Sequence, residues 1–157
     1  MLDERLDYTA ENCSIARTLE IVGERWTLLL LREAFYGMRR FDDFIRALGC
    51  PRTVLSARLG KLVEAGLMRR EEYREPGMRT RSEYRLTRQG VELFPILVAL
   101  LQWGDHWMGD PQGPAVELTH RGCGAPLTLT LGCEAGHAPL SALDVQARPG
   151  PGARRAA

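Results

Sequence analysis

Apolar residues recur at helical spacing through the first part of the chain. Residues 13–22 predict a short helix that Ser14 can cap and that Gly23 interrupts. Residues 24–35 predict a second helix, which contains four consecutive leucines. Because an apolar run this dense requires burial on most sides, we expect the second helix at a domain centre or at a dimer interface.

Two further helices are predicted on either side of a tight turn. Residues 41–48 place their apolar side chains on one face, and Gly49 follows in the position of a helix C-cap. The next helix starts near Pro51, which suits a first turn because its missing N–H has no helical partner there. We expect that helix to end at Gly66.

The spacing then changes from helical to alternating. Residues 67–75 and 79–86 predict the two arms of a β-hairpin, and the Pro-Gly pair within residues 75–78 predicts its turn. The segment Thr87–Met108 predicts a long helix that is capped by its threonine and is kinked or restarted at Pro95.

Charge and element order together indicate DNA binding. The chain of 157 residues has a net charge of only +1, but residues 39–85 carry 12 basic and 7 acidic side chains. A basic middle third suits a phosphate-binding surface, although a solvated charged face gives the same pattern. The order helix, glycine turn, helix and arginine-bearing hairpin is that of a helix-turn-helix with a wing. The second helix of such a unit enters the major groove.

That second helix has a leucine face and a small-residue face. Three leucines fall in one sector and must face the core: Leu55, Leu59 and Leu62. The opposite side carries the candidates for contact with bases, which are Thr53, Ser56, Ala57, Gly60 and Lys61. Arg52 can reach a base or a phosphate from the first turn. Arg58, beside the leucine sector, suits a phosphate or an intramolecular partner.

Arg79 and Arg81 lie nearest the hairpin tip and are the candidates for contact with phosphates or an adjacent minor groove. A charged, soluble hairpin edge would contain the same residues. A winged-helix module for protein partners predicts acidic or apolar residues on the outward helix face, and the small polar residues there argue against it. We find no P-loop, nucleophile elbow or complete metal-hydrolase motif, so we expect no enzyme.

Several motifs in order resemble those of the HxlR-type (MarR-like) winged helix-turn-helix regulators. The motifs that carry the resemblance are Cys13–Leu19, Val22–Leu30, Arg40–Phe44, Leu55–Leu59 and Tyr84–Gly90. The resemblance spans residues 13–108 and implies a homodimer paired through the first and last helices of the domain. It also implies repression or activation of a nearby operon. The chain departs from the family pattern at Cys50-Pro51 and in a slightly longer wing around residues 77–80.

Cys13 matches the N-terminal cysteine with which some relatives sense oxidants or electrophiles. Sensing requires an accessible thiolate, which the dipole of a helix N-terminus favours, and Cys13 directly precedes the first predicted helix. A buried packing role is the alternative for Cys13. For Cys50, in the turn, we expect packing.

Two ligand-like pairs flank a predicted strand at residues 127–131: His120 with Cys123, and Cys133 with His137. Tetrahedral Zn²⁺ accepts two cysteines and two histidines, so the pairs predict a zinc site if they converge. The segment is also similar to a degraded form of the Cys-Gly…Cys-x-x-Cys-Gly extension of many HxlR-type proteins. A zinc-free hairpin that docks its leucine face is the alternative.

We therefore predict a mostly α-helical fold with a small β-wing and a small C-terminal β-hairpin appendage. Residues 1–109 form the winged helix-turn-helix domain for DNA binding and dimerisation, residues 110–147 a Cys- and His-containing β-rich extension, and residues 148–157 a disordered tail. The expected function is regulation of transcription, as a repressor that binds specific double-stranded DNA as a homodimer. We expect its effector to be a redox signal or a small molecule.

The chain has no run of about 18 apolar residues, and its acidic N-terminus is unlike a signal peptide. We therefore expect no membrane partner and a cytoplasmic location.

Overall fold

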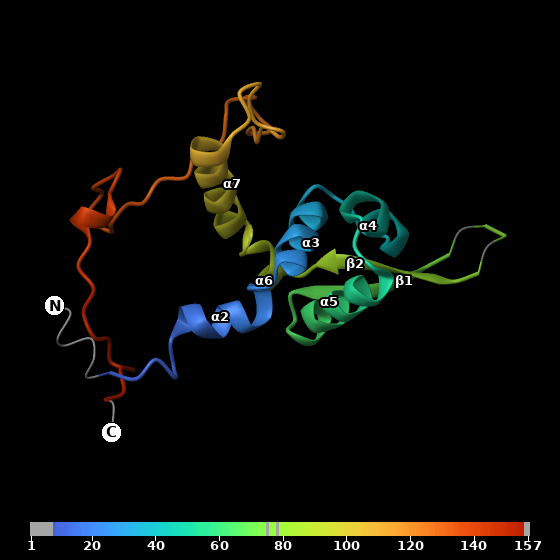
Figure 1. Cartoon of the computed structure of the whole chain (residues 1–157), viewed down its shortest axis with the longest axis horizontal. Coiled ribbons are helices and arrows are strands. Elements are labelled where there is room, and N and C mark those ends of the chain that lie inside the picture. The colour runs from blue at the N-terminus through green and yellow to red at the C-terminus, as the bar shows by residue number, and fades with distance from the viewer. Residues whose placement is uncertain (1–7, 75, 78, 156–157) are drawn as a thin grey trace. The chain divides into compact units, whose positions relative to one another are not determined.

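The chain is divided into two units, each with its own elements. The computed structural model describes residues 8–74, 76–77 and 79–155 (Figure 1). The first unit runs to Phe94 and includes the last residues from Ala153; the second is Pro95–Gly152. The sequence had placed the boundary later, after residue 109.

The first unit is mostly helical and carries the two strands. Its elements are α2 (Ser14–Val22), α3 (Arg25–Phe35), α4 (Phe41–Leu48), α5 (Arg52–Glu64), β1 (Met68–Tyr73), β2 (Arg81–Leu86) and α6 (Arg88–Val91). The helix α7 (Phe94–Met108) starts at the end of this unit and continues into the second, which also contains a short 3₁₀ helix, η1 (Ala142–Asp144).

The leucine face of α5 forms the centre of the first core. Leu55, Leu59 and Leu62 are each at most 1% exposed, which confirms the predicted face. The helix contacts α3, α4 and β1, which contribute further fully buried side chains: Leu30, Leu31, Phe44 and Met68. Burial of one such side chain contributes about 1.5–3 kcal/mol. This face therefore fixes the rotation of α5 and leaves its opposite side in solvent.

A left-handed glycine makes the turn between α4 and α5. Gly49 adopts φ +62°, and its N–H donates to the Ile45 carbonyl oxygen at 2.9 Å, so it ends α4 as predicted. Cys50 follows and is buried, in agreement with a packing role. Pro51 is the N-cap of α5, and the first turn begins at Arg52. The sequence had placed Pro51 within that first turn.

The helix α2 differs from expectation at its start. Its N-cap is Cys13, whose side chain makes no capping hydrogen bond, and Ser14 is already helical. The predicted cap at Ser14 is therefore wrong: Ser14 is the first helical residue, and Cys13 occupies the N-cap position. Ile15 and Leu19 are exposed, and Val22 is the residue of this helix that is buried.

The wing is an antiparallel pair of strands anchored to the chain before α4. Met68 lies opposite Leu86 and Tyr73 opposite Arg81, so both strands stop short of the predicted tip. On the other edge of β2, the Tyr84 N–H donates to the Arg39 carbonyl oxygen at 2.8 Å. Of the predicted turn, residues 75 and 78 lie outside the described part of the chain.

The junction after the wing depends on Thr87 and Gly90. The Thr87 hydroxyl oxygen accepts the Gly90 N–H at 3.1 Å and caps α6, as predicted. A Cβ at Gly90 would lie 2.1 Å from the Leu67 carbonyl oxygen, so only glycine allows this close approach. The helix ends after four residues, and α7 begins anew with Pro95 in its first turn, which is the restart that the sequence allowed.

The predicted strand at 127–131 in the second unit is wrong. Its backbone bonds to a side chain of α7: Gln102 Nε2 donates to the Leu127 carbonyl oxygen at 2.8 Å, and the Leu129 N–H donates to Gln102 Oε1 at 3.3 Å. Without a partner strand, the Leu-Thr alternation forms no ladder. The expected hairpin is reduced to a loop closed by an isolated bridge between Thr119 and Pro126.

The predicted tail makes backbone contacts near its end. Arg155 forms an antiparallel bridge with Tyr8, and the Thr9 N–H donates to the Arg154 carbonyl oxygen at 2.9 Å. Among the described residues, no helix has the length and hydrophobicity that a membrane span requires.

Candidate nucleic-acid interface

The outward face of α5 exposes the small residues that the sequence selected. Thr53, Ser56, Ala57 and Gly60 are all exposed, on the side opposite the buried leucines. A helix face of this kind admits a close approach of the backbone to base edges, and its hydroxyl and methyl groups match the major-groove pattern of donors, acceptors and thymine methyl groups. The structure therefore brings these candidates together on one surface.

Two other candidates on α5 bind within the protein. Arg58 donates to Glu24 Oε1 at 2.9 Å, and its side chain is only 25% exposed. The Lys61 ammonium donates to the carbonyl oxygen of Glu20. Arg58 thus has the intramolecular partner that its position beside the leucine sector allowed. Both side chains hold α5 to the segment of the chain around α2 and α3.

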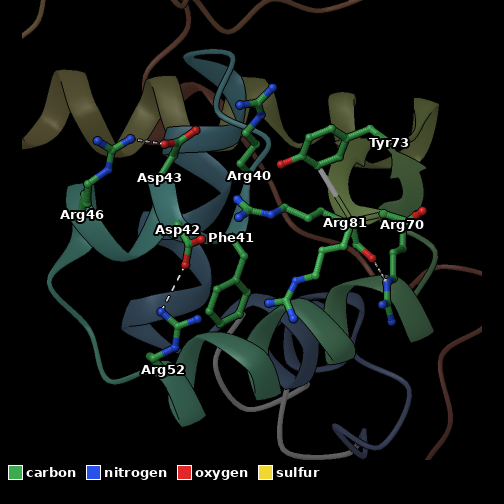
Figure 2. A pocket seen from close by; sticks show the side chains of 12 residues that line it. Arg40, Phe41, Asp42, Asp43, Arg46, Arg52, Arg70, Tyr73 and Arg81 are labelled. Atoms are coloured by element: carbon green, nitrogen blue, oxygen red, sulfur yellow. Dashed lines mark hydrogen bonds and ion pairs between the residues drawn. The ribbon is translucent and has the colours of Figure 1, made fainter. Parts of the chain in front are cut away.

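An arginine-lined cleft lies beside the small-residue face. Figure 2 shows side chains from α4, the start of α5 and the wing that converge on it. The cleft has a volume of about 580 Å³ and is lined by Arg40, Phe41, Asp42, Asp43, Arg46, Arg52, Arg70, Tyr73, Arg79, Thr80, Arg81 and Ser82. Six arginines against two aspartates give the cleft a positive field, which attracts phosphate.

Ion pairs within the wing neutralise two arginines of its strands, Arg69 and Arg85. Glu71 accepts from Arg69 at 2.5 Å and from Arg85 at 2.8 Å, and Arg85 also pairs with Glu83 at 2.6 Å. The hydrogen bond from Arg69, supported by the charge of nearby arginines, lowers the pKa of Glu71 below its ordinary value. Glu71 therefore remains ionised at neutral pH, and these two arginines contribute little free positive charge.

The arginines at the tip end of the wing are different. Arg79 and Arg81 are exposed, line the cleft, and have no side-chain hydrogen bond or ion pair within the described part of the chain. Their charge is available to an external anion at no cost in broken ion pairs. These two residues are therefore the wing's strongest candidates for phosphate contact, as the sequence predicted.

Arg52 is held by the first turn of α4. Its guanidinium donates to Asp42 Oδ1 at 3.1 Å and lies over the Phe41 ring, 4.9 Å from the ring centroid (Figure 2). Another pair across the cleft, Arg40 over the Tyr73 ring, is 4.7 Å from the centroid. Sequence reasoning found Arg52 but missed its partners, because the spacing of residues along α4 does not reveal which face meets α5.

The two His–Cys pairs of the second unit form locally but do not meet. The Nδ1 and Sγ atoms are 3.2 Å apart in both pairs, His120 with Cys123 and Cys133 with His137. Within the described residues, no three His, Cys, Asp or Glu side chains come together as metal ligands. Each pair thus offers two of the four ligands that a structural zinc site needs. Zinc binding here stays a prediction.

Three features define a winged helix-turn-helix DNA-binding protein. They are the helix α5, which is anchored in the core and has a small-residue outer face, the glycine turn before it, and the basic two-stranded wing. A model of the HxlR-like helix-turn-helix family matches residues 21–112. The chain belongs to this family, whose members are transcriptional regulators.

The individual proteins that the chain resembles are also described as transcriptional regulators or transcription factors. The chain is 47% identical to the uncharacterized HTH-type transcriptional regulator Rv3095 of Mycobacterium tuberculosis, over 94% of this chain and 92% of that protein. It is 37% identical to PA1607, a candidate transcription factor, whose crystal structure matches with a TM-score of 0.79 over 88% of this chain and 95% of that one. A reduced form of the redox regulator HypR matches at 29% identity with a TM-score of 0.54, over 59% of this chain and 90% of that one.

Substitution of both Arg79 and Arg81 by alanine should weaken binding to every duplex and flatten its salt dependence. Each lost phosphate contact should reduce the slope of log K against log salt by about 0.9, so the double variant should lose about 1.8. Fluorescence anisotropy across a salt series measures the slope. The control removes two arginines outside the cleft, Arg88 and Arg148. A loss confined to one DNA sequence would contradict a phosphate role.

Proposed function

We propose that this protein is a homodimeric repressor that recognises a specific duplex DNA site and that an oxidant controls through Cys13. The observation that carries the proposal is the exposed small-residue face of α5 beside the arginine-lined cleft. A helix that presents small side chains can lie deep in the major groove, where each base pair shows a distinct pattern. The neighbouring cations then bind the backbone phosphates and fix the helix in register.

Recognition and affinity come from different parts of this surface. Arg52, Thr53, Ser56 and Ala57 face the base edges, whereas Arg79 and Arg81 bind phosphates. Arg58 and Lys61 lie at the margin of the interface and act through the position of α5. Repression needs only occupation of a promoter, which a bound dimer of this size achieves by excluding other proteins.

Substitution of Arg52 and Ser56 by alanine together should abolish specific binding and leave the dimer intact. Loss of two base contacts should cost about 2–5 kcal/mol, or about 30-fold and more in affinity for the specific site. The site is first selected from random duplexes with the unaltered protein, and anisotropy then compares it with a scrambled duplex. Arg88→Ala on α6 is the charge-matched control. Equal affinity of the double variant and the unaltered protein for the selected site would refute the recognition role.

The proposed dimer rests on apolar faces that the chain leaves uncovered. On α7, Ile96, Leu100, Trp103 and Trp107 recur at intervals of four, three and four residues, and each is between 45% and 69% exposed. This spacing places them in one stripe along the helix. A second copy of the chain is the occupant that we propose, because helix-turn-helix dimers bind two related half-sites and therefore need a symmetric interface. Exposed Ile15 and Leu19 on α2 offer a further apolar face.

Substitution of Leu100 and Trp103 by glutamate together should yield a monomer of 17.6 kDa. The charges would be buried without partners at the interface, which an association of this kind does not tolerate. Sedimentation equilibrium measures the mass, and binding to the selected site should weaken in parallel. Leu143→Glu is the matched control, because Leu143 is apolar and 97% exposed but lies outside α7. A dimer that survives both glutamates would place the interface elsewhere.

Two observations on Cys13 support the proposed control by an oxidant. It is half-buried and is the N-cap of α2, where the helix dipole favours the thiolate. The neighbour HypR is described as a redox regulator, which supports the same role here. Peroxide would convert the thiolate to a sulfenic acid and be reduced to water. The added polar group would disturb the start of α2 and the adjacent apolar face at Ile15.

If Cys13 is the sensor, Cys13→Ser should retain DNA binding after peroxide or quinone treatment that inactivates the unaltered protein. Gel-shift titration before and after treatment measures the effect, and an added reductant should restore the unaltered protein. Cys123→Ser serves as the control, because that thiol is exposed but lies in the second unit. Identical loss of binding in Cys13→Ser and the unaltered protein would remove Cys13 from the mechanism. A small-molecule effector stays a prediction.

A further inference from the structure

Arg52 is the one arginine at the start of α5, and α4 restrains it from two sides. The Asp42 carboxylate accepts its hydrogen bond at 3.1 Å, and the Phe41 ring lies under the guanidinium at 4.9 Å. Both partners belong to the first turn of α4, so one short segment sets the direction of the side chain. Arg52 and Asp42 nevertheless remain 68% and 63% exposed, so the restrained guanidinium is open to a ligand.

The location of Asp42 is costly for binding DNA. It lines a cleft in which Arg79 and Arg81 have no ion-pair partner within the described part of the chain, and a carboxylate there repels phosphate. An exposed ion pair of this kind contributes little to folding stability. Asp42 therefore lowers the affinity of the cleft for any duplex without a matching gain in stability. The remaining benefit of Asp42 is its effect on the orientation of Arg52.

We propose that Asp42 is a specificity-determining residue, which positions Arg52 to read a base edge and keeps it from binding backbone phosphate. A free arginine at this position binds phosphates of every sequence. Held by Asp42 and Phe41, the planar guanidinium presents its remaining N–H groups in a fixed direction, as bidentate contact with guanine requires. Asp42 thus reduces non-specific affinity more than specific affinity. The inference rests on the proposed function, since it concerns the same surface.

A neighbouring residue provides the matched control. Asp43 also lies in the first turn of α4 and lines the same cleft, and it pairs with Arg46, three residues along the same helix. Asp43→Asn therefore removes the same charge from nearly the same place but leaves the Arg52 clamp in place. A general electrostatic effect predicts the same behaviour for both asparagine variants, whereas a positioning role predicts a difference.

The test measures the ratio of affinities for the selected site and a scrambled duplex of equal length. Asp42→Asn should tighten binding to the scrambled duplex by about three- to tenfold and steepen its salt slope by about 0.9. Its affinity ratio should fall by about fivefold or more, and the loss should concentrate at one base pair when the site is varied. Asp43→Asn should shift both affinities by a similar factor and keep the ratio within about twofold. Asp42→Glu, which keeps the carboxylate, should restore most of the ratio.

A further variant guards against a change in folding. Arg52→Lys keeps the positive charge but loses the planar guanidinium. The ratio of affinities for the selected site and the scrambled duplex should therefore fall, while the affinity for the scrambled duplex stays nearly constant. An unchanged ratio in Asp42→Asn, or an equal fall in Asp43→Asn, would overturn the inference and leave the proposed function standing. Failure of the unaltered protein to select any preferred duplex would instead overturn the proposed function itself.

Discussion

The burial of one face of α5 is the constraint on which the rest of the DNA-binding unit depends. Leu55, Leu59 and Leu62 fix the rotation of the helix against α3, α4 and β1. A helix turned by one residue, or about 100°, would expose these leucines and bury polar residues in their place, either Ser56 or Arg58 with Lys61. The same packing presents the small outer face to solvent and brings the start of α5 next to the first turn of α4. The spacing of residues along α5 therefore determines both which side chains form the core and which are exposed to DNA.

Acidic residues neutralise some of the arginines on this surface and leave others free. The wing carries many arginines, but Glu71 and Glu83 neutralise Arg69 and Arg85, whereas Arg79 and Arg81 at the tip end form no ion pair within the described residues. In the cleft, Asp42 restrains Arg52 in the same way. A surface made only of free cations would bind all DNA tightly and distinguish none of it, because phosphates carry no sequence information. Acidic residues that restrain particular arginines shift the balance from affinity to discrimination.

The sequence predicted what depends on local periodicity and turn chemistry. The leucine face, the C-cap at Gly49 and the cap at Thr87 follow from residues within one or two helical turns, and each was found. The strand at 127–131 failed because alternation shows that a segment can form a strand but not that a partner strand exists. The Asp42–Arg52 pair was missed for a related reason: ten residues and a turn separate its members. Partners brought together by packing leave no spacing to detect.

The second unit has few buried residues to stabilise it. From Pro95 to Gly152, Val98 is the one residue in the buried class, so this unit has almost no core of its own. Its loop segment is attached to α7 by two hydrogen bonds of Gln102, and each contributes only about 1 kcal/mol. A stretch of that length cannot offset its conformational entropy with such contacts. The apolar stripe of α7 is an exposed surface that could stabilise this unit, because burial of each of its four large side chains would contribute about 1.5–3 kcal/mol. Association of two chains through this stripe, as in the proposed dimer, would therefore stabilise the second unit together with the interface.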